Sequence, residues 1–310
     1  MSDHRADPDL ADVLHPPHEA GHRVHVPTRI VAEWPAGTFL ENLALDQDGC
    51  SWLVTSPSDN AVYRVGPEGS VHTAARFVKT PTGIATHPVL GTLVAVGTQG
   101  QPNHELFRIT GSGAELVCGL SGVLGANGIV WDGDRLFVAD SARSLVTRVD
   151  VSAATTTVWL EHELLTPRSP ESKLPGINGL AVHDGWLVMS SSDRGVVVRA
   201  PVASLEPTSE LEVVAERLVA DDFAVADDGR IFLATHTFHS VLCLYPDGRR
   251  EDVATHADGI AGPTSVAIGS GASPSLYVTT TGGLLSPPDG NVEPARVVRI
   301  DALREDDYRH

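Results

Sequence analysis

The sequence predicts an all-β protein, a six-bladed β-propeller closed by an N-terminal strand. A short strand-like segment occurs six times, and successive copies start 41 to 51 residues apart. The 29 glycines and 21 prolines of the chain supply turns between short apolar runs. A repeat of about 40–50 residues in which every copy is β-like is typical of a four-stranded propeller blade. Six copies therefore predict six blades in one domain.

Each copy has a bulky apolar residue at its third position and a small or β-branched residue at its fourth. The first copy, residues 41–45, reads ENLAL, and residues 178–182 repeat it as NGLAV. The copies begin at Glu41, Thr82, Asn127, Asn178, Asp221 and Thr264. In a propeller the first strand of each blade lies nearest the axis, so we expect these six segments to surround it.

Blade one shows the order of strands that the other blades repeat. After residues 41–45 come strand-like runs at 51–55, 61–65 and 71–77. Turn sequences with glycine separate them, at Asp48-Gly49 and Pro67-Glu68-Gly69, because glycine tolerates the positive φ of tight turns. The second strands of blades two to six are expected at 92–96, 135–139, 186–189, 231–235 and 276–279, and the third strands at 105–109, 145–149, 196–199, 241–244 and 297–300. Second strands are almost wholly apolar, as expected where both faces of a sheet are covered.

The ends of the chain complete the predicted organisation. Residues 1–22 are polar and rich in His, Pro and Asp, which predicts a flexible N-terminal arm. Residues 23–34 alternate like a strand, whereas blade six has no outer strand after residues 296–300. We therefore expect the N-terminal strand to complete blade six and close the ring. The propeller spans residues 23–302, and residues 303–310 form a C-terminal tail.

Two connections are longer than the rest, residues 161–175 and 281–294. The first joins the outer strand of blade three to the leading strand of blade four. The second joins the second and third strands of blade six. Both kinds of connection emerge at the end of the ring where leading strands begin, so we expect both loops beside one mouth of the central channel, as lids over a binding site.

Charge and cysteine content narrow the class of partner. Forty Asp and Glu against 22 Lys and Arg give a net charge of −18, which argues against nucleic acid and anionic membranes as partners and favours a cation or a neutral ligand. The expected partner is a small-molecule substrate. Cys50, Cys118 and Cys243 lie far apart in apolar runs, so we expect three buried thiols in a reducing compartment. No apolar stretch of about 18 residues and no signal sequence is present, which predicts a cytoplasmic protein.

The first residues of the six copies are all polar and should meet at the axis. They comprise two carboxylates, Glu41 and Asp221, two carboxamides, Asn127 and Asn178, and two hydroxyls. Two carboxylates on one axis would repel each other without a cation, and oxygen donors suit a hard divalent ion. Ca²⁺ is the expected cofactor, with Mg²⁺ or Mn²⁺ as alternatives. The structural alternative is that these residues are polar because the channel end is wet.

These residues carry a resemblance to a known family. The set Glu41, Asn127, Asn178 and Asp221, with the phrases GINGLAV, DDFAVADDG and GPTSVAIG, resembles the SMP-30/gluconolactonase/LRE family, also called regucalcin-like, over roughly residues 30 to 302. Members are six-bladed calcium propellers that include lactonases and phosphotriesterases. The resemblance implies that these four residues hold the metal. Asp222 stands where many relatives have Gly, and the phrasing is closer to a branch resembling fungal biosynthetic-cluster proteins, some of which resemble hetero-Diels-Alder cyclases.

Three functions follow as expectations. The first is Ca²⁺-dependent hydrolysis of a lactone or related ester bound above the metal at one mouth of the channel. The second is a cyclase or isomerase of secondary metabolism that uses the same pocket. The third is a non-catalytic calcium-binding or ligand-binding propeller.

Catalytic and substrate-contact residues can be named for the hydrolase. Asp221 is the first candidate for the general base, and His236, in the turn after the second strand of blade five, is the second. His236 could equally be an ordinary loop histidine. The residues expected to contact the substrate are Thr82, Asp222, Thr264 and Arg168.

Overall fold

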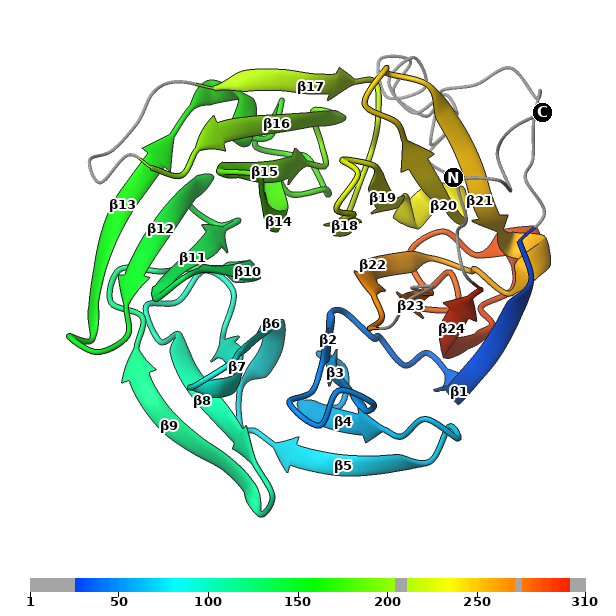
Figure 1. Cartoon of the computed structure of the whole chain (residues 1–310), viewed down its shortest axis with the longest axis horizontal. Coiled ribbons are helices and arrows are strands. Elements are labelled where there is room, and N and C mark those ends of the chain that lie inside the picture. Colours follow the sequence, from blue (N-terminus) through cyan, green and yellow to red (C-terminus); the bar gives the residue numbers. More distant parts are fainter. Residues whose placement is uncertain (1–25, 204–210, 271–274, 302–310) are drawn as a thin grey trace, which may run out of the picture.

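The computed structural model describes residues 26–203, 211–270 and 275–301. These residues form six four-stranded antiparallel sheets arranged around one axis (Figure 1), which confirms the predicted six-bladed propeller. The predicted arm, residues 1–22, and tail, residues 303–310, lie outside the described residues. Their boundaries with the propeller stay predictions.

The leading strands lie innermost in the ring (Figure 1). They are β2 (Leu43–Leu45), β6 (Thr80–His87), β10 (Ala126–Asp132), β14 (Ile177–His183), β18 (Phe223–Val225) and β22 (Pro263–Ile268). In blades one and five the strand begins two residues after the predicted start. Glu41 and Asp221 therefore precede their strands. The N–H of Glu41 still bonds the carbonyl of Thr55, and the N–H of Asp221 bonds the carbonyl of Ala234, both in the second strand of the same blade.

The second and third strands follow the predicted order closely. The second strands are β3 (Trp52–Ser56), β7 (Gly91–Gly97), β11 (Arg135–Asp140), β15 (Trp186–Ser191), β19 (Ile231–Ala234) and β23 (Leu276–Thr280). The third strands are β4 (Ala61–Val65), β8 (Glu105–Thr110), β12 (Leu145–Asp150), β16 (Val196–Pro201), β20 (Ser240–Leu244) and β24 (Pro294–Ile300). Every residue of β7 is buried, as its apolar sequence predicts.

The outer strands complete the blades, and one of them closes the ring. They are β5 (Val71–Arg76), β9 (Gly113–Gly119), β13 (Thr155–Glu161), β17 (Glu212–Glu216), β21 (Arg250–Thr255) and, for blade six, β1 (Thr28–Ala36). Strand β1 pairs antiparallel with β24 from Thr28 opposite Ile300 to Ala36 opposite Pro294. The predicted closure by the N-terminal strand is confirmed, and this pairing joins the two ends of the described chain.

The core lies between neighbouring blades, where side chains of adjacent sheets interlock. Between blades three and four, for example, Phe137, Trp159 and Ile177 belong to one buried cluster. One prediction about buried residues is wrong. Cys118 and Cys243 are buried free thiols, but Cys50 is exposed, because it lies in the turn between β2 and β3 and not in a strand.

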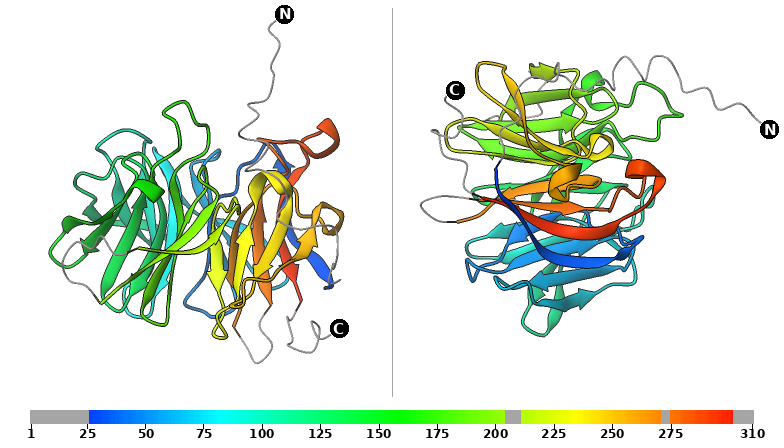
Figure 2. Two further views of the ribbon diagram at one scale, coloured as in Figure 1. Left: turned by 90° about the horizontal axis from the view of Figure 1, so that it is seen from above. Right: turned by 90° about the vertical axis from the view of Figure 1, so that its right-hand side faces the viewer.

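The two long loops lie at the same end of the propeller. Residues 162–176, which include the 3-10 turn η1 (Glu163–Leu165), lead into β14, and residues 281–293, with η4 (Pro288–Gly290), leave the end of β23. Two further 3-10 turns, η2 (His236–Phe238) and η3 (His256–Asp258), occur in blade five. Figure 2 (left) shows the red segment that contains η4 projecting at the upper end of the propeller.

Candidate active site

Backbone irregularities direct the leading polar side chains toward the axis. The pairing of β6 with β7 shifts between Pro81 and Ile84, and the same shift interrupts β10 between Ala126 and Ile129 and β14 between Ile177 and Leu180. Thr82, Asn127 and Asn178 lie inside these shifts. Such bulges are common beside functional sites because they re-aim a side chain.

Glycine follows these residues because the leading strands approach one another closely. A Cβ atom on Gly83 would lie closer than 3.0 Å to the carbonyl oxygen of Asn127, and one on Gly128 would lie 2.6 Å from that of Asn178. No side chain fits in that space. The Thr-Gly pair of blade two and the Asn-Gly pairs of blades three and four thus reflect both the bulge and the tight packing of these blades around the axis.

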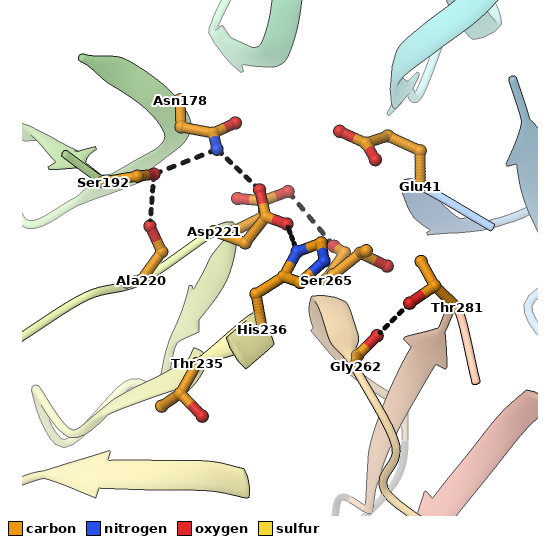
Figure 3. A network of polar contacts seen from close by, with 12 residues as sticks. Glu41, Asn178, Ser192, Ala220, Asp221, Thr235, His236, Gly262, Ser265 and Thr281 are labelled. Atoms are coloured by element: carbon orange, nitrogen blue, oxygen red, sulfur yellow. Dashed lines mark hydrogen bonds and ion pairs between the residues drawn. The ribbon is translucent and has the colours of Figure 1, made fainter. Parts of the chain in front are cut away.

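Asn178 and Asp221 form the centre of a buried polar network (Figure 3). The Asn178 side-chain amide donates to Asp221 Oδ1 at 2.6 Å and to Ser192 Oγ at 3.0 Å. The Ser192 hydroxyl in turn donates to the carbonyl of Ala220 at 2.6 Å. Both amide hydrogens of Asn178 are therefore used, and its carbonyl oxygen is directed away from Asp221.

The second oxygen of Asp221 binds His236. Nδ1 of His236 lies 2.5 Å from Asp221 Oδ2, and both side chains are at least nine-tenths buried. An ionised carboxylate only accepts hydrogen bonds, so Nδ1 carries the proton and donates it to Asp221. In the neutral imidazole Nε2 is then the nitrogen with the free lone pair; it is buried and has no partner among the described residues. His236 also has a positive φ of 45°, a conformation that is costly outside glycine and is often found at functional sites.

Glu41 and Asn127 supply the remaining predicted donors. Both are half-buried, and within the described part of the chain neither side chain has a hydrogen-bond partner. In Figure 3 the Glu41 carboxylate points toward Asn178 and Asp221. Burial raises the pKa of Glu41 well above its usual value, and the charges of Asp221 and Asp222 raise it further. Glu41 thus shares one electrostatic environment with both aspartates.

Asp222 lies directly beside these groups. Its carboxylate accepts the Phe223 N–H at 2.8 Å and the Ser265 hydroxyl at 3.1 Å. Burial raises the pKa of Asp222 to about 7, and the charge of Asp221 adds to this, although the two hydrogen bonds oppose it. A Cβ on Gly179 would lie less than 3.0 Å from the Asp222 carboxylate. Asp222 therefore occupies the space that a side chain at position 179 would need.

These raised pKa values predict a pH-dependent stability of the metal-free protein. The native state holds protons on Asp222 and Glu41 that the unfolded chain releases from about pH 4 upward. With a chelator present, this contribution to the free energy of unfolding is therefore lost as the pH rises from about 4 to about 7. Thermal unfolding should show Tm falling over this window by at least about 2 °C more in the natural protein than in Asp222→Asn. Equal slopes for the two proteins would contradict it.

The side chains of the other predicted substrate-contact residues bond to groups outside this network. The Thr82 hydroxyl donates to Ala126 O at 2.8 Å, and the fully buried Thr264 hydroxyl donates to Leu40 O at 2.8 Å, so both join adjacent blades. Arg168 lies in the loop before β14, where its N–H bonds the buried carboxylate of Asp193 at 2.5 Å and its Nε lies 3.5 Å from the same oxygen. These geometries favour structural roles, and a substrate contact by any of the three stays a prediction.

Three residues near the network were not anticipated from the sequence. Ser192 and Phe39 have no repeat-position or motif signal that distinguishes them from other serines and aromatic residues. Ser265 is second in the sixth copy, as Asp222 is in the fifth, but nothing in the sequence indicates that its hydroxyl bonds Asp222. The run Ser190-Ser191-Ser192-Asp193 after an apolar strand was the one available hint, because small hydroxyl side chains are unusual in a fully buried strand end.

The donors present fit a divalent cation. The Glu41 side chain, which has no partner among the described residues, points toward an Asn178 carbonyl and an Asp221 carboxylate that retain lone pairs, and a cation would offset the repulsion between the carboxylates. The Asn127 side chain also has no hydrogen-bond partner within the described part of the chain. Among the described residues no group of three His, Cys, Asp or Glu side chains is placed to hold a metal. The predicted set differs from such groups because half of its donors are carboxamides.

The fold and this site define a six-bladed propeller with a buried acid–amide–imidazole network at one end of its axis. The sequence matches no family model and no curated protein. Solved structures do match. Luciferin-regenerating enzyme has a TM-score of 0.67 and 12% identity, covering 90% of this chain and 96% of that chain. Regucalcin from Agrobacterium tumefaciens, a calcium-binding protein, has a TM-score of 0.65 and 14% identity, covering 92% and 98%. A gluconolactonase from Xanthomonas campestris has a TM-score of 0.65 and 12% identity, covering 90% of each chain.

These similarities show that the chain has the fold that the resemblance implied. The similar structures carry the names of the SMP-30/gluconolactonase/LRE group, whereas the resemblance to a fungal biosynthetic branch stays a prediction. Within the described residues, no helix has the length and apolar character needed to cross a bilayer.

Proposed function

We propose that this chain is a metal-dependent hydrolase of a lactone or related ester, with the substrate bound beside Asp221 and His236. The observation that carries the proposal is the 2.5 Å contact between Asp221 and Nδ1 of His236, which leaves Nε2 of a buried imidazole without a partner among the described residues. A carboxylate that orients a neutral imidazole is the arrangement that general-base catalysis requires. The similar structures of a gluconolactonase and a regucalcin support the reaction class and the ion.

Glu41, Asn127, Asn178 and Asp221 would hold the ion, for which Ca²⁺ is the first choice and Mg²⁺ or Mn²⁺ the alternatives. When bound, such an ion polarises the substrate carbonyl and stabilises negative charge on its oxygen. Asn178 is preset for this task because its two amide hydrogens are engaged by Asp221 and Ser192, which leaves its carbonyl oxygen as the free donor atom.

In the proposed reaction Nε2 of His236 accepts a proton from the attacking water, whose oxygen bonds to the carbonyl carbon. Asp221 holds the imidazole in the correct tautomer and stabilises the imidazolium that forms. The bond between the carbonyl carbon and the leaving oxygen then breaks, and that oxygen takes the proton from His236, which gives a hydroxy acid. The sequence favoured Asp221 as the base; the geometry favours His236, because each Asp221 oxygen already accepts a hydrogen bond.

Removal and return of metal ions tests this proposal. After dialysis against a chelator, kcat/KM on a panel of lactones should fall by at least about 100-fold, since the stabilisation of the oxyanion is lost. Addition of Ca²⁺ should restore it, and Mg²⁺ and Mn²⁺ should be compared at the same concentration. Activity that survives complete removal of divalent ions would overturn the metal-dependent mechanism. Tight Ca²⁺ binding without turnover of any lactone would favour the non-catalytic alternative, and turnover of a polyene without hydrolysis would favour the cyclase.

A further inference from the structure

The charges around the site restrict the kind of substrate that it can accept. Glu41, Asp221 and Asp222 place three carboxyl groups in one environment. Among the described residues, no Lys or Arg forms an ion pair with any of them. Arg168, which the sequence predicts to contact the substrate, lies against Asp193. A bound divalent ion would leave no excess of positive charge, so the site has nothing to offset a negatively charged substrate.

One aromatic side chain reaches this network from blade one. Phe39 lies two residues before Glu41, and its ring centroid is 6.2 Å from that of His236, with the ring planes 48° apart. Blade six lies between blade one and blade five in the ring, so this contact joins segments of two blades that are not neighbours. Phe39 therefore lies beside the imidazole that we propose as the general base.

The backbone around Phe39 is fixed, although its side chain is not part of the core. Its N–H donates to Ser58 Oγ at 2.9 Å, and the carbonyl of Leu40 accepts the Thr264 hydroxyl. Thr38 and Leu40 are buried, whereas Phe39 between them is partly exposed. A partly exposed aromatic ring on a fixed backbone can stack against a planar group without the cost of ordering the main chain that carries it.

We propose that the substrate is uncharged and carries an aromatic or other planar apolar group that packs against Phe39, with its ester carbonyl directed at Asn178 and Asp221. This inference rests on the proposed function. It names Phe39 as a substrate-contact residue that determines specificity, and it excludes lactones that carry a phosphate or a free carboxylate. Sugar-derived lactones without an apolar ring are expected to be poor substrates.

The test compares three lactones with the full-length protein and Ca²⁺: dihydrocoumarin, the aliphatic δ-valerolactone and a ring-carboxylated dihydrocoumarin. We expect kcat/KM on dihydrocoumarin to exceed that on each of the others by at least about tenfold, which is the size of effect that one aromatic contact and its buried area provide. Phe39→Ala should lower kcat/KM on dihydrocoumarin by about tenfold, mainly through KM, and change δ-valerolactone by less than about threefold. Phe39→Tyr should retain the preference, and Phe39→Leu replaces Phe39→Ala if the latter fails to fold.

The outcomes separate this inference from the proposed function. Equal rates on the three lactones, or faster hydrolysis of the carboxylated one, would overturn the substrate class while the hydrolase function stands. Hydrolysis of none of them would overturn the proposed function. In that case calorimetric titration with 3-(2-hydroxyphenyl)propanamide and with the corresponding carboxylate still decides the inference: tighter binding of the neutral amide, weakened in Phe39→Ala, supports it, and equal binding of the two overturns it.

Discussion

Replacement of His236 by Gln is expected to lower kcat for lactone hydrolysis by about 10²–10⁴-fold, with KM changed by less than about threefold. The Gln amide can still donate to Asp221, but it has no basic nitrogen in the place of Nε2, so the loss falls on the chemical step. Steady-state kinetics at saturating Ca²⁺ measures this. Because His236 has a positive φ, His236→Asn, which tolerates that conformation, serves as a second variant.

His239→Gln is the matched control for this prediction. His239 lies three residues further along the same turn and also has a positive φ, of 53°, but its Nδ1 accepts the Gly262 N–H and does not contact Asp221. Its kcat is expected to change by less than about threefold. A His236 variant that retains full kcat, or equal losses in both variants, would remove His236 from the reaction.

Asp221→Asn is expected to lower the affinity for Ca²⁺ by about 10- to 100-fold. It should also lower kcat by at least about 100-fold, even at a saturating concentration of the ion. In the natural protein both oxygens of Asp221 accept hydrogen bonds, from Asn178 and from His236. An Asn side chain has one acceptor oxygen and one donor group, so it can satisfy only one of these partners and presents a donor to the other. Calorimetric titration with Ca²⁺ and steady-state kinetics measure the two losses separately.

Asp193→Asn controls for the loss of a buried, hydrogen-bonded carboxylate away from the network. Asp193 is 3% exposed and accepts the N–H of Arg168 and the hydroxyl of Ser172, so it anchors the loop before β14. Its replacement should lower Tm but leave the affinity for Ca²⁺ within about threefold. If Asp221→Asn lowers Tm and leaves ion affinity intact, the role assigned to Asp221 at the metal is wrong.

The positions of the strands could be read from the sequence because each blade repeats the same local signals. Apolar runs such as 61–65 coincide with β4 (Ala61–Val65), and the unpaired third strand of blade six correctly indicated closure by β1. Cys50 is an exception, because it is exposed where the local sequence predicted a buried residue. Its neighbours suggested a strand, but the turn at Asp48-Gly49 extends one residue further, since the Asp48 carboxylate accepts the N–H groups of Cys50 and Ser51.

The same distinction applies to the candidate site, where some residues share a repeat position and others do not. Glu41, Asn127, Asn178 and Asp221 share a repeat position, and repetition alone brings equivalent positions to one axis. The contacts of Ser192, Asp222 and Phe39 depend on the distance between particular blades and on the path of particular loops. No periodic pattern encodes those quantities, so the roles of these residues became visible only in three dimensions.

The sequence by itself determined the number of blades, the closing strand and the polar character of the axis, because these follow from local propensities repeated six times. Only the tertiary structure decided that both Asp221 oxygens are engaged, that the remaining nitrogen of His236 is unpartnered, and that Phe39 lies against it. The physical reason is that hydrogen bonds and ring contacts act over a few ångströms between residues far apart in the chain, and such separations exist only once the blades have packed together.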